Sequence, residues 1–332
     1  MIDRDLLYLA PHATIGGLFL LSVFPYYIKE QTRIKLQIVA HTAIAVIFFF
    51  VPAYFLKPTI VGKFTPLHGF LQRFCSAVHF GLSYQLWKCR NYGRPEQAMI
   101  FARLITSFIF LIAKGFAIWH LTERKSKAIQ ITDNFLYCTL LTDATWFLSE
   151  FVRMYRNKRC RQEEIDAMIK RTTLWVDGKG KFYFENAFYV DAGLTLTYAI
   201  IHFAFPQHVL QLILKSDNKL DSHHFLWCRL FGALNLIPAV TSITAKYFTP
   251  EVQTAYLSGR LITQSVVFLL NIYGHWVLAV YSANHITAFM ISGFFSSFLF
   301  STFHKTFRNY FENNSNEEEE EIEQDIDEKK EL

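Results

Sequence analysis

The sequence predicts an all-α, polytopic membrane protein with about nine transmembrane helices, arranged as an N-terminal helix followed by two parallel four-helix repeats. Apolar residues make up 52% of the 332 residues and charged residues only 18%, with 34 phenylalanines. This composition is more apolar than that of a soluble domain of the same length. Apolar runs of roughly 20 residues recur along the chain, which is enough to cross a ~30 Å hydrocarbon core as helices.

The repeat is clearest around two arginines. The tetrapeptide Arg-Leu-Ile-Thr occurs at 103–106 and again at 260–263, each time after a Pro-Glu pair and with its arginine one or two turns inside a long apolar run. Upstream, Arg73 aligns with Arg229, which lies 156 residues later, whereas the two tetrapeptides are 157 residues apart. One residue of slippage relates both pairs of anchors, so we interpret the pattern as an internal duplication.

The first apolar run, about 6–28, follows Met-Ile-Asp-Arg-Asp, which has neither the basic region nor the cleavage site of a signal peptide. We therefore expect a retained transmembrane helix within residues 1–30. A first module over 31–152 follows, with expected spans near 36–55, 67–87, 98–119 and 131–151.

The segment 153–183 is polar and holds nine Lys and Arg residues. It predicts a basic cytosolic linker, in which 162–170 has the pattern of a short amphipathic helix at the membrane surface. A second module over 184–306 and an acidic tail over 307–332 complete the chain, with expected spans near 185–205, 225–245, 252–276 and 285–303.

Basic residues in the short loops predict the orientation in the membrane. Lysines and arginines concentrate in 29–35, 88–97, 153–183 and the residues after 303, and such loops favour the cytosolic side. The N-terminus is then lumenal and the C-terminus cytosolic. The basic cluster at 124–127 opposes this assignment.

The C-terminal tail has its own features. From 311 to 332 its net charge is −9, so residues 1–310 carry +14. Lys329 and Lys330 are the fourth and third residues from the end, which resembles the dilysine retrieval signal of endoplasmic reticulum membrane proteins; a chance pair of lysines is the alternative. Retrieval implies the coat-protein machinery as a partner and a cytosolic tail, where the sequon at Asn313 would stay unglycosylated.

Charged residues inside apolar spans are the strongest pointers to function, because each costs several kcal/mol unless it finds a partner. In the first module Arg103 matches Glu150 in depth, and a flexible Lys114 can reach Asp143. In the second module Asn271 stands where Lys114 would be.

Arg260 has no acid on the expected fourth span of the second module, so we expect it to pair with Asp191 on the first. These pairs either join helices or form a ligand or ion site. His79 and Asn235 occupy equivalent interior positions, where hydrogen bonds between helices are expected.

The sequence predicts no metal site and no cofactor. The twelve histidines are scattered apart from the adjacent His223 and His224, unlike the clustered histidine boxes of membrane di-iron enzymes. The five cysteines form no Cys-x-x-Cys pair. No nucleotide, phosphate-loop or hydrolase motif is present, and no nucleic-acid partner is expected.

Arg73 followed by Ser76-Ala77, and Arg229 followed by Gly232-Ala233, resemble the start of one span in the DoxX-like class of four-helix membrane proteins. The resemblance covers each module once, over 36–151 and 185–303. It implies a compact four-helix bundle without a shared chemistry, so it assigns no catalytic residue.

These features favour a multi-pass protein of the endoplasmic reticulum that binds or moves a small or lipidic ligand between two helical modules. A membrane-embedded lipid-modifying enzyme is the first alternative, with Asp143, Glu150, Asp191 and His79 as candidate groups. The second is a structural or chaperone-like partner of other membrane proteins that docks through its acidic tail. Membrane lipid is an expected partner in each case.

Overall fold

The structure is a computed structural model that describes residues 4–24, 29–90, 97–124, 131–156, 187–245, 248–286 and 289–308. The expected amphipathic helix of the linker, the acidic tail beyond residue 308, Asn313 and the two terminal lysines lie outside these ranges. Within them the chain is helical apart from short connections and two isolated bridges, so the all-α prediction is confirmed.

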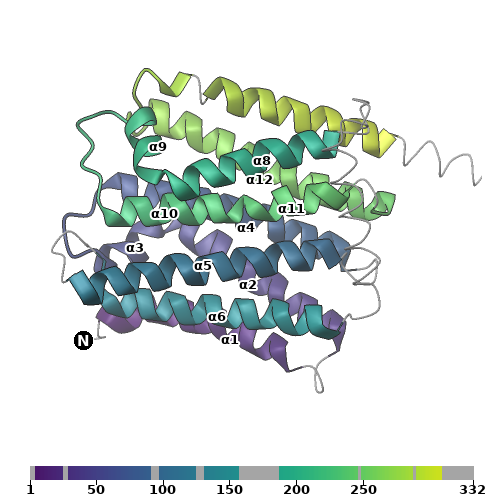
Figure 1. The fold of residues 1–332 in the computed structure, drawn as a ribbon, viewed down its shortest axis with the longest axis horizontal. Helices are drawn as coiled ribbons and strands as arrows, with labels where there is room; N and C mark the ends of the chain where they lie inside the picture. Colours follow the sequence, from purple (N-terminus) through teal and green to yellow (C-terminus); the bar gives the residue numbers. More distant parts are fainter. Residues whose placement is uncertain are drawn as a thin grey trace, which may run out of the picture.

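The long helices lie side by side in one bundle, and no sheet separates them (Figure 1). They are α1 (Arg4–Val23), α2 (Glu30–Phe50), α4 (Pro66–Cys89), α5 (Gln97–Arg124), α6 (Asp133–Arg156), α8 (Ala187–Ala204), α10 (Ser222–Leu234), α11 (Leu236–Ala245) and α12 (Pro250–Trp276). Residues 289–308 are also helical. The short elements are α3 (Pro52–Leu56), η1 (Lys57–Thr59) and α9 (Pro206–Ile213).

Five described stretches are long and apolar enough to cross a membrane: 31–50, 98–120, 187–204, 222–245 and 251–276. A shorter apolar stretch, 9–23, lies in α1. Helices α4 and α6 fall in the ranges that the sequence predicts as spans, but they carry more polar side chains, many of them buried among neighbouring helices.

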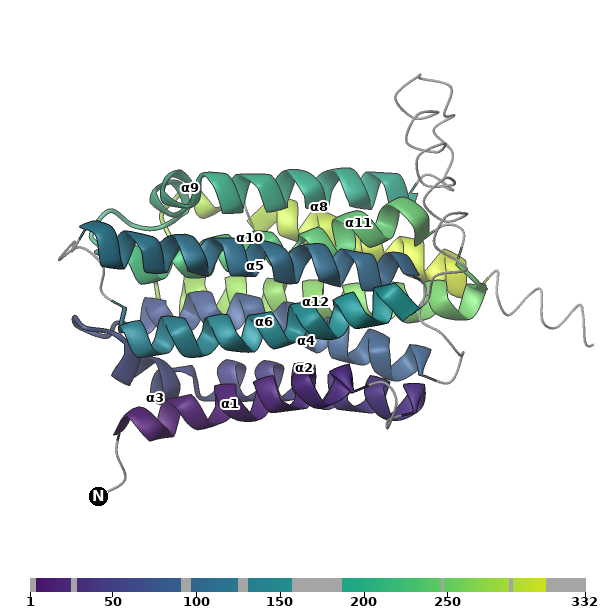
Figure 2. The ribbon, with the colours of Figure 1, turned by 60° about the horizontal axis from the view of Figure 1, so that its bottom comes forward.

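The same turn follows α2 and α8. Val51 has φ −125° and ψ 42°, and Phe205, 154 residues later, has φ −122° and ψ 47°. Each residue precedes a proline at the start of a short helix, α3 or α9, where the missing N–H of proline costs nothing. Both short helices lie at the end of the bundle where the N-terminus lies (Figures 1 and 2).

The next helices, α4 and α10, begin with the same unusual cap. Thr65 caps α4 with His68 at the third helical position, and Asp221 caps α10 with His224 at that position, 156 residues later. Glutamate or glutamine usually stands there in a capping box. In both boxes a histidine Nδ1 lies within 3.1 Å of the backbone N–H of the capping residue.

The first half of the chain comprises α1 to α6 and the second half begins with α8. The two halves are in close contact along α4 and α12. Gly81 and Gly259 let the two backbones approach, since a Cβ atom on Gly81 would lie 2.3 Å from the Gly259 carbonyl oxygen. Small residues at such crossings are typical of helix packing in membranes. A second contact joins α5 to the second half, where Thr106 Oγ1 donates to the Ala233 carbonyl at 3.4 Å.

Candidate functional site

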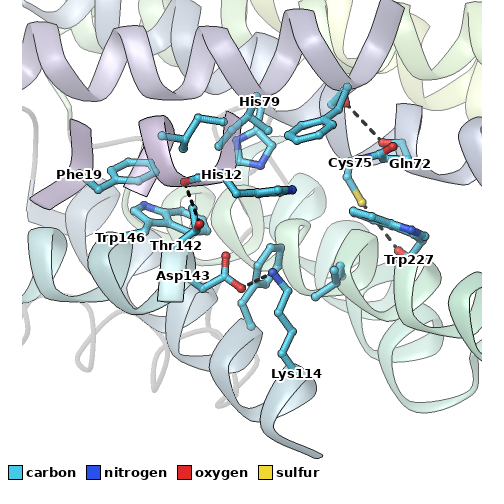
Figure 3. A pocket seen from close by; sticks show the side chains of 16 residues that line it. His12, Phe19, Gln72, Cys75, His79, Lys114, Thr142, Asp143, Trp146 and Trp227 are labelled. Carbon is cyan, nitrogen blue, oxygen red and sulfur yellow. Dashed lines mark hydrogen bonds and ion pairs between the residues drawn. The ribbon is translucent and has the colours of Figure 1, made fainter. Parts of the chain in front are cut away.

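A cavity of about 60 Å³ lies within the first half of the bundle and is closed on one side by α10. Five helices of the first half (α1, α2, α4, α5 and α6) and Trp227 and Leu230 of α10 form its wall. In Figure 3, Phe19 and Trp146 lie at one end of the cavity and Cys75 and Trp227 at the other. Because a buried water needs roughly 10–15 Å³ of such volume, the cavity has room for about four to six waters.

One ion pair faces this cavity. Lys114 Nζ of α5 lies 2.5 Å from Asp143 Oδ2 of α6, and Lys114 also donates to the Thr139 carbonyl at 3.3 Å. Their side chains are 7% and 10% exposed. Apart from Lys114, no residue in the described part of the chain donates a hydrogen bond to Asp143 Oδ2. A buried carboxylate oxygen in the cavity wall therefore keeps the capacity to accept a hydrogen bond.

Two histidines lie across the cavity from this pair (Figure 3). His79 of α4 contacts His41 of α2 through their Nδ1 atoms, 3.0 Å apart, so the expected interhelical hydrogen bond is present. His12 of α1 stacks on Phe48 with ring centroids 5.0 Å apart, and its carbonyl accepts from Thr142 Oγ1 at 3.1 Å. The wall thus combines a cation, an anion and two imidazoles.

The remaining charges of the first half form a separate network. Arg103 holds Glu150 with two bonds, from Nε to Oε1 at 2.8 Å and from Nη2 to Oε2 at 3.2 Å. Gln37 donates to the same carboxylate at 3.3 Å, and Arg153 Nη1 lies 3.8 Å from it. Arg103 and Glu150 are fully buried, and neither lines the cavity.

In the second half, the pair expected between α8 and α12 is present. Arg260 Nη2 lies 2.8 Å from Asp191 Oδ1. Ser242 and Tyr256 also donate to Asp191 through their hydroxyl groups. This network is likewise outside the cavity wall.

The two aligned arginines bind backbone carbonyls. Arg73 Nε donates to the Phe49 carbonyl near the end of α2 at 2.8 Å, and Arg229 Nε donates to the Phe203 carbonyl near the end of α8 at 3.3 Å. Each arginine therefore satisfies a carbonyl that the helix end leaves free. Asn235 differs from expectation, since its Nδ2 donates to the Phe231 carbonyl of its own segment at 2.8 Å rather than across helices, where α10 gives way to α11.

Sequence reasoning overlooked several polar members of these sites. His12 lies in an apolar run without a charged neighbour, and Gln37, Ser242 and Tyr256 are common polar residues with no distinctive spacing. The only available signal was a polar side chain within an expected span, which by itself does not separate a site residue from a helix-packing residue.

The apolar helices and the buried intramembrane ion pairs define a multi-pass helical membrane protein. The chain belongs to the family whose model is described as a domain of unknown function, DUF8292, which matches residues 35–303. Neither the curated proteins nor the solved structures contain a match to this chain. The family match does not extend to the DoxX-like class, so that resemblance stays a hypothesis.

Proposed function

We propose that this protein binds a small polar ligand in the cavity between Lys114, Asp143, His12 and His79, within the membrane of the endoplasmic reticulum. The observation that carries the proposal is the buried ion pair of Lys114 and Asp143, a cation and an anion that face one cavity together with His12 and His79. Ionisable groups at membrane depth are costly and mark ligand, ion or proton sites.

The size of the cavity favours a small ligand over a lipid. Sites for drug-sized ligands usually measure about 300–1,000 Å³, whereas this cavity measures about 60 Å³. Water, a proton carried on water, or a ligand of a few heavy atoms fits, and an acyl chain does not. The sequence leaves a small ligand and a lipidic ligand open, and the size of the cavity supports the small one.

An internal duplication accounts for the two matching halves. Helix α1 precedes both copies and has no counterpart in the second. The turns at Val51 and Phe205, and the histidine-containing caps of α4 and α10, support two copies of one module. The four-helix character implied by the DoxX-like resemblance agrees with this reading.

The second copy has lost the charges that face the cavity in the first. At the position of Lys114 it has Asn271, whose Oδ1 accepts from Tyr281 at 2.9 Å. His12 comes from α1, which precedes both copies. We therefore assign ligand binding to the first copy.

The proposed protein has nine transmembrane segments in total and a lumenal N-terminus.

A lipid-modifying enzyme has less support. Of its four candidate groups, Glu150 and Asp191 are engaged by arginines away from the cavity, so only Asp143 and His79 could touch a bound molecule. An acid or base acts only within hydrogen-bond reach of its substrate, and the cavity has no room for a lipid chain.

The test is a density map of the full chain, purified from its own membranes into lipid nanodiscs. Non-protein density in contact with Asp143 Oδ2 or Lys114 Nζ is expected. It should weaken in the variant Asp143→Asn and persist in Glu150→Gln, which alters the buried pair that is remote from the cavity. A cavity closed by side chains, or filled by an acyl chain continuous with the bilayer, would contradict the proposal.

Movement of the ligand is tested with the smallest candidate, the proton. Proteoliposomes with an imposed pH gradient and an internal pH dye should show a flux that Asp143→Asn abolishes and Glu150→Gln leaves. A flux equal to that of empty liposomes would restrict the function to binding.

The third function, docking of a protein partner, depends on the acidic tail. Deletion of 311–328 with the last four residues kept should leave ligand density and flux unchanged. If the deletion abolishes the capture of a partner protein, and no ligand is found in the intact chain, docking replaces ligand binding as the function.

A further inference from the structure

Three potential metal ligands meet where the caps of α4 and α10 touch, at the end of the bundle near α3 and α9. His68 Nε2 lies 2.9 Å from Asp221 Oδ2, and the rings of His68 and His224 are 4.0 Å apart between centroids. One donor atom from each of the three residues lies within 4.8 Å of the others. Both histidines are at most 1% exposed, and the side chain of Asp221 is 11% exposed.

The hydrogen bonds around the two rings suit metal binding through Nε2. Without a metal, each Nδ1 accepts from a capping N–H group, at 3.0 Å from Thr65 N for His68 and at 3.1 Å from Asp221 N for His224. With a metal on Nε2 the ring proton would sit on Nδ1, and an acceptor lies within reach of each: Asp221 Oδ1 is 2.7 Å from His224 Nδ1, and Thr65 Oγ1 is 2.9 Å from His68 Nδ1. In metal sites a ligating imidazole usually donates its other N–H in this way, which fixes the ring and its tautomer.

Several nitrogens in the cluster lack a partner within the described residues. His224 Nε2 has none, and the adjacent His223, which is fully buried, has none at either ring nitrogen. Buried polar atoms are nearly always satisfied, and an exception points to a water or an ion. The unpartnered Nε2 of His224 is therefore the second observation, beside the geometry, that indicates a ligand.

Asp221 supplies the negative charge that a cation requires. Its carboxylate lies between the two rings, with Oδ2 2.9 Å from His68 Nε2 and Oδ1 2.7 Å from His224 Nδ1.

We infer that His68, Asp221 and His224 bind one divalent transition-metal ion of the zinc class. Two imidazoles and one carboxylate form a ligand set that zinc accepts, at bond lengths of about 2.0–2.2 Å. In a tetrahedral site these lengths place neighbouring ligand atoms about 3.4 Å apart, so the widest separation, at most 4.8 Å, closes by small side-chain rotations. Water at the exposed edge of Asp221 completes the coordination.

The ion would tie the two halves of the chain together. His68 belongs to the first half, and Asp221 and His224 belong to the second. The cluster lies one helical turn from Gln72 and Trp227 in the cavity wall, but it shares no residue with that wall, and the inference does not depend on the cavity ligand.

The test uses the full chain in detergent, produced without a polyhistidine tag, and Zn²⁺ in competition with a chelator. One zinc per chain is expected. His68→Gln and His224→Gln should each weaken binding at least about 10-fold, because glutamine can still accept from the capping N–H as in an ordinary capping box but carries no imidazole. His208→Gln, at an exposed histidine of α9, is the matched control and should leave the affinity unchanged.

X-ray absorption of zinc bound to the wild-type chain tests the ligands without any variant, and should show imidazole and oxygen ligands. Removal of the ion with a chelator should lower the midpoint of thermal unfolding in the wild type but not in His224→Gln. Absence of stoichiometric zinc, equal affinity in all variants, or a sulfur-ligated spectrum would overturn the inference.

Discussion

Arg260 and Asp191 form a buried ion pair that joins α12 to α8, with 2.8 Å between Nη2 and Oδ1. The pair is part of a larger network, since Ser242 and Tyr256 both hydrogen-bond to Asp191 Oδ2 and lie 2.5 Å from each other through their hydroxyl oxygens. Neither charge can reach water, as Asp191 is 2% and Arg260 3% exposed. Arg260 and the two hydroxyl groups therefore take the place of water around the Asp191 carboxylate.

Removal of one member of this pair should be worse than removal of both. Asp191→Asn leaves a buried guanidinium without its carboxylate and should cost about 3–5 kcal/mol of stability. The double variant Asp191→Asn with Arg260→Gln should be more stable than Asp191→Asn alone. Thermal unfolding of the purified variants measures both effects. Asp217→Asn, at an exposed aspartate, is the control and should be neutral; a double variant worse than either single one would contradict the pairing.

The close approach of α4 and α12 should not tolerate a methyl group. In Gly81→Ala the new Cβ atom would lie 2.0 Å from Thr263 Oγ1 and 2.3 Å from the Gly259 carbonyl oxygen, so the helices would have to separate. The expected loss is about 1–3 kcal/mol or more, measured as a lower unfolding midpoint. Gly115→Ala and Gly193→Ala are matched controls, because a Cβ at either position meets no described atom within 4 Å. Equal stability of all three variants would disprove the contact.

The orientation in the membrane can be read by glycosylation. Val61 is 68% exposed, and Val61→Asn with Lys63→Thr creates an Asn-Gly-Thr sequon in a loop expected to be lumenal. That sequon should be used. Glu30→Asn creates Asn-Gln-Thr in a loop expected to be cytosolic and should remain unmodified, as should Asn313. The reverse pattern, or protection of a C-terminal tag from protease in intact microsomes, would invert the topology.

The terminal lysines should determine the cellular location. If Lys329 and Lys330 act as a retrieval signal, changing both to serine should move the protein from a reticular pattern to later compartments of the secretory route. The control changes Lys305, outside the terminal tetrapeptide, to serine and should leave the distribution as it is. An unchanged distribution of the double variant would make the terminal lysines incidental.

The sequence by itself determined the all-α class and the intramembrane ion pairs. Apolar runs of sufficient length leave the backbone no alternative to helices in a membrane, because every N–H and C=O group must be satisfied within the segment. The pairs Arg103–Glu150, Lys114–Asp143 and Arg260–Asp191 were predictable for a related reason: few charges lie at membrane depth, and an unpaired one is costly. The depth of each charged residue in the membrane therefore left few residues of opposite charge with which it could pair.

Only the tertiary structure decided which of these charges face a cavity and which histidines meet. Lys114 and Arg103 lie on the same helix, yet only Lys114 reaches the cavity, because the angular position of each residue on α5 is set by packing against neighbouring helices. His68 and His224 are 156 residues apart, and no local spacing relates them to a metal. They become neighbours because the first turns of α4 and α10 pack against each other. That packing depends on the shapes of the side chains between the two halves of the chain, whereas the pattern of apolar residues along each half does not specify it.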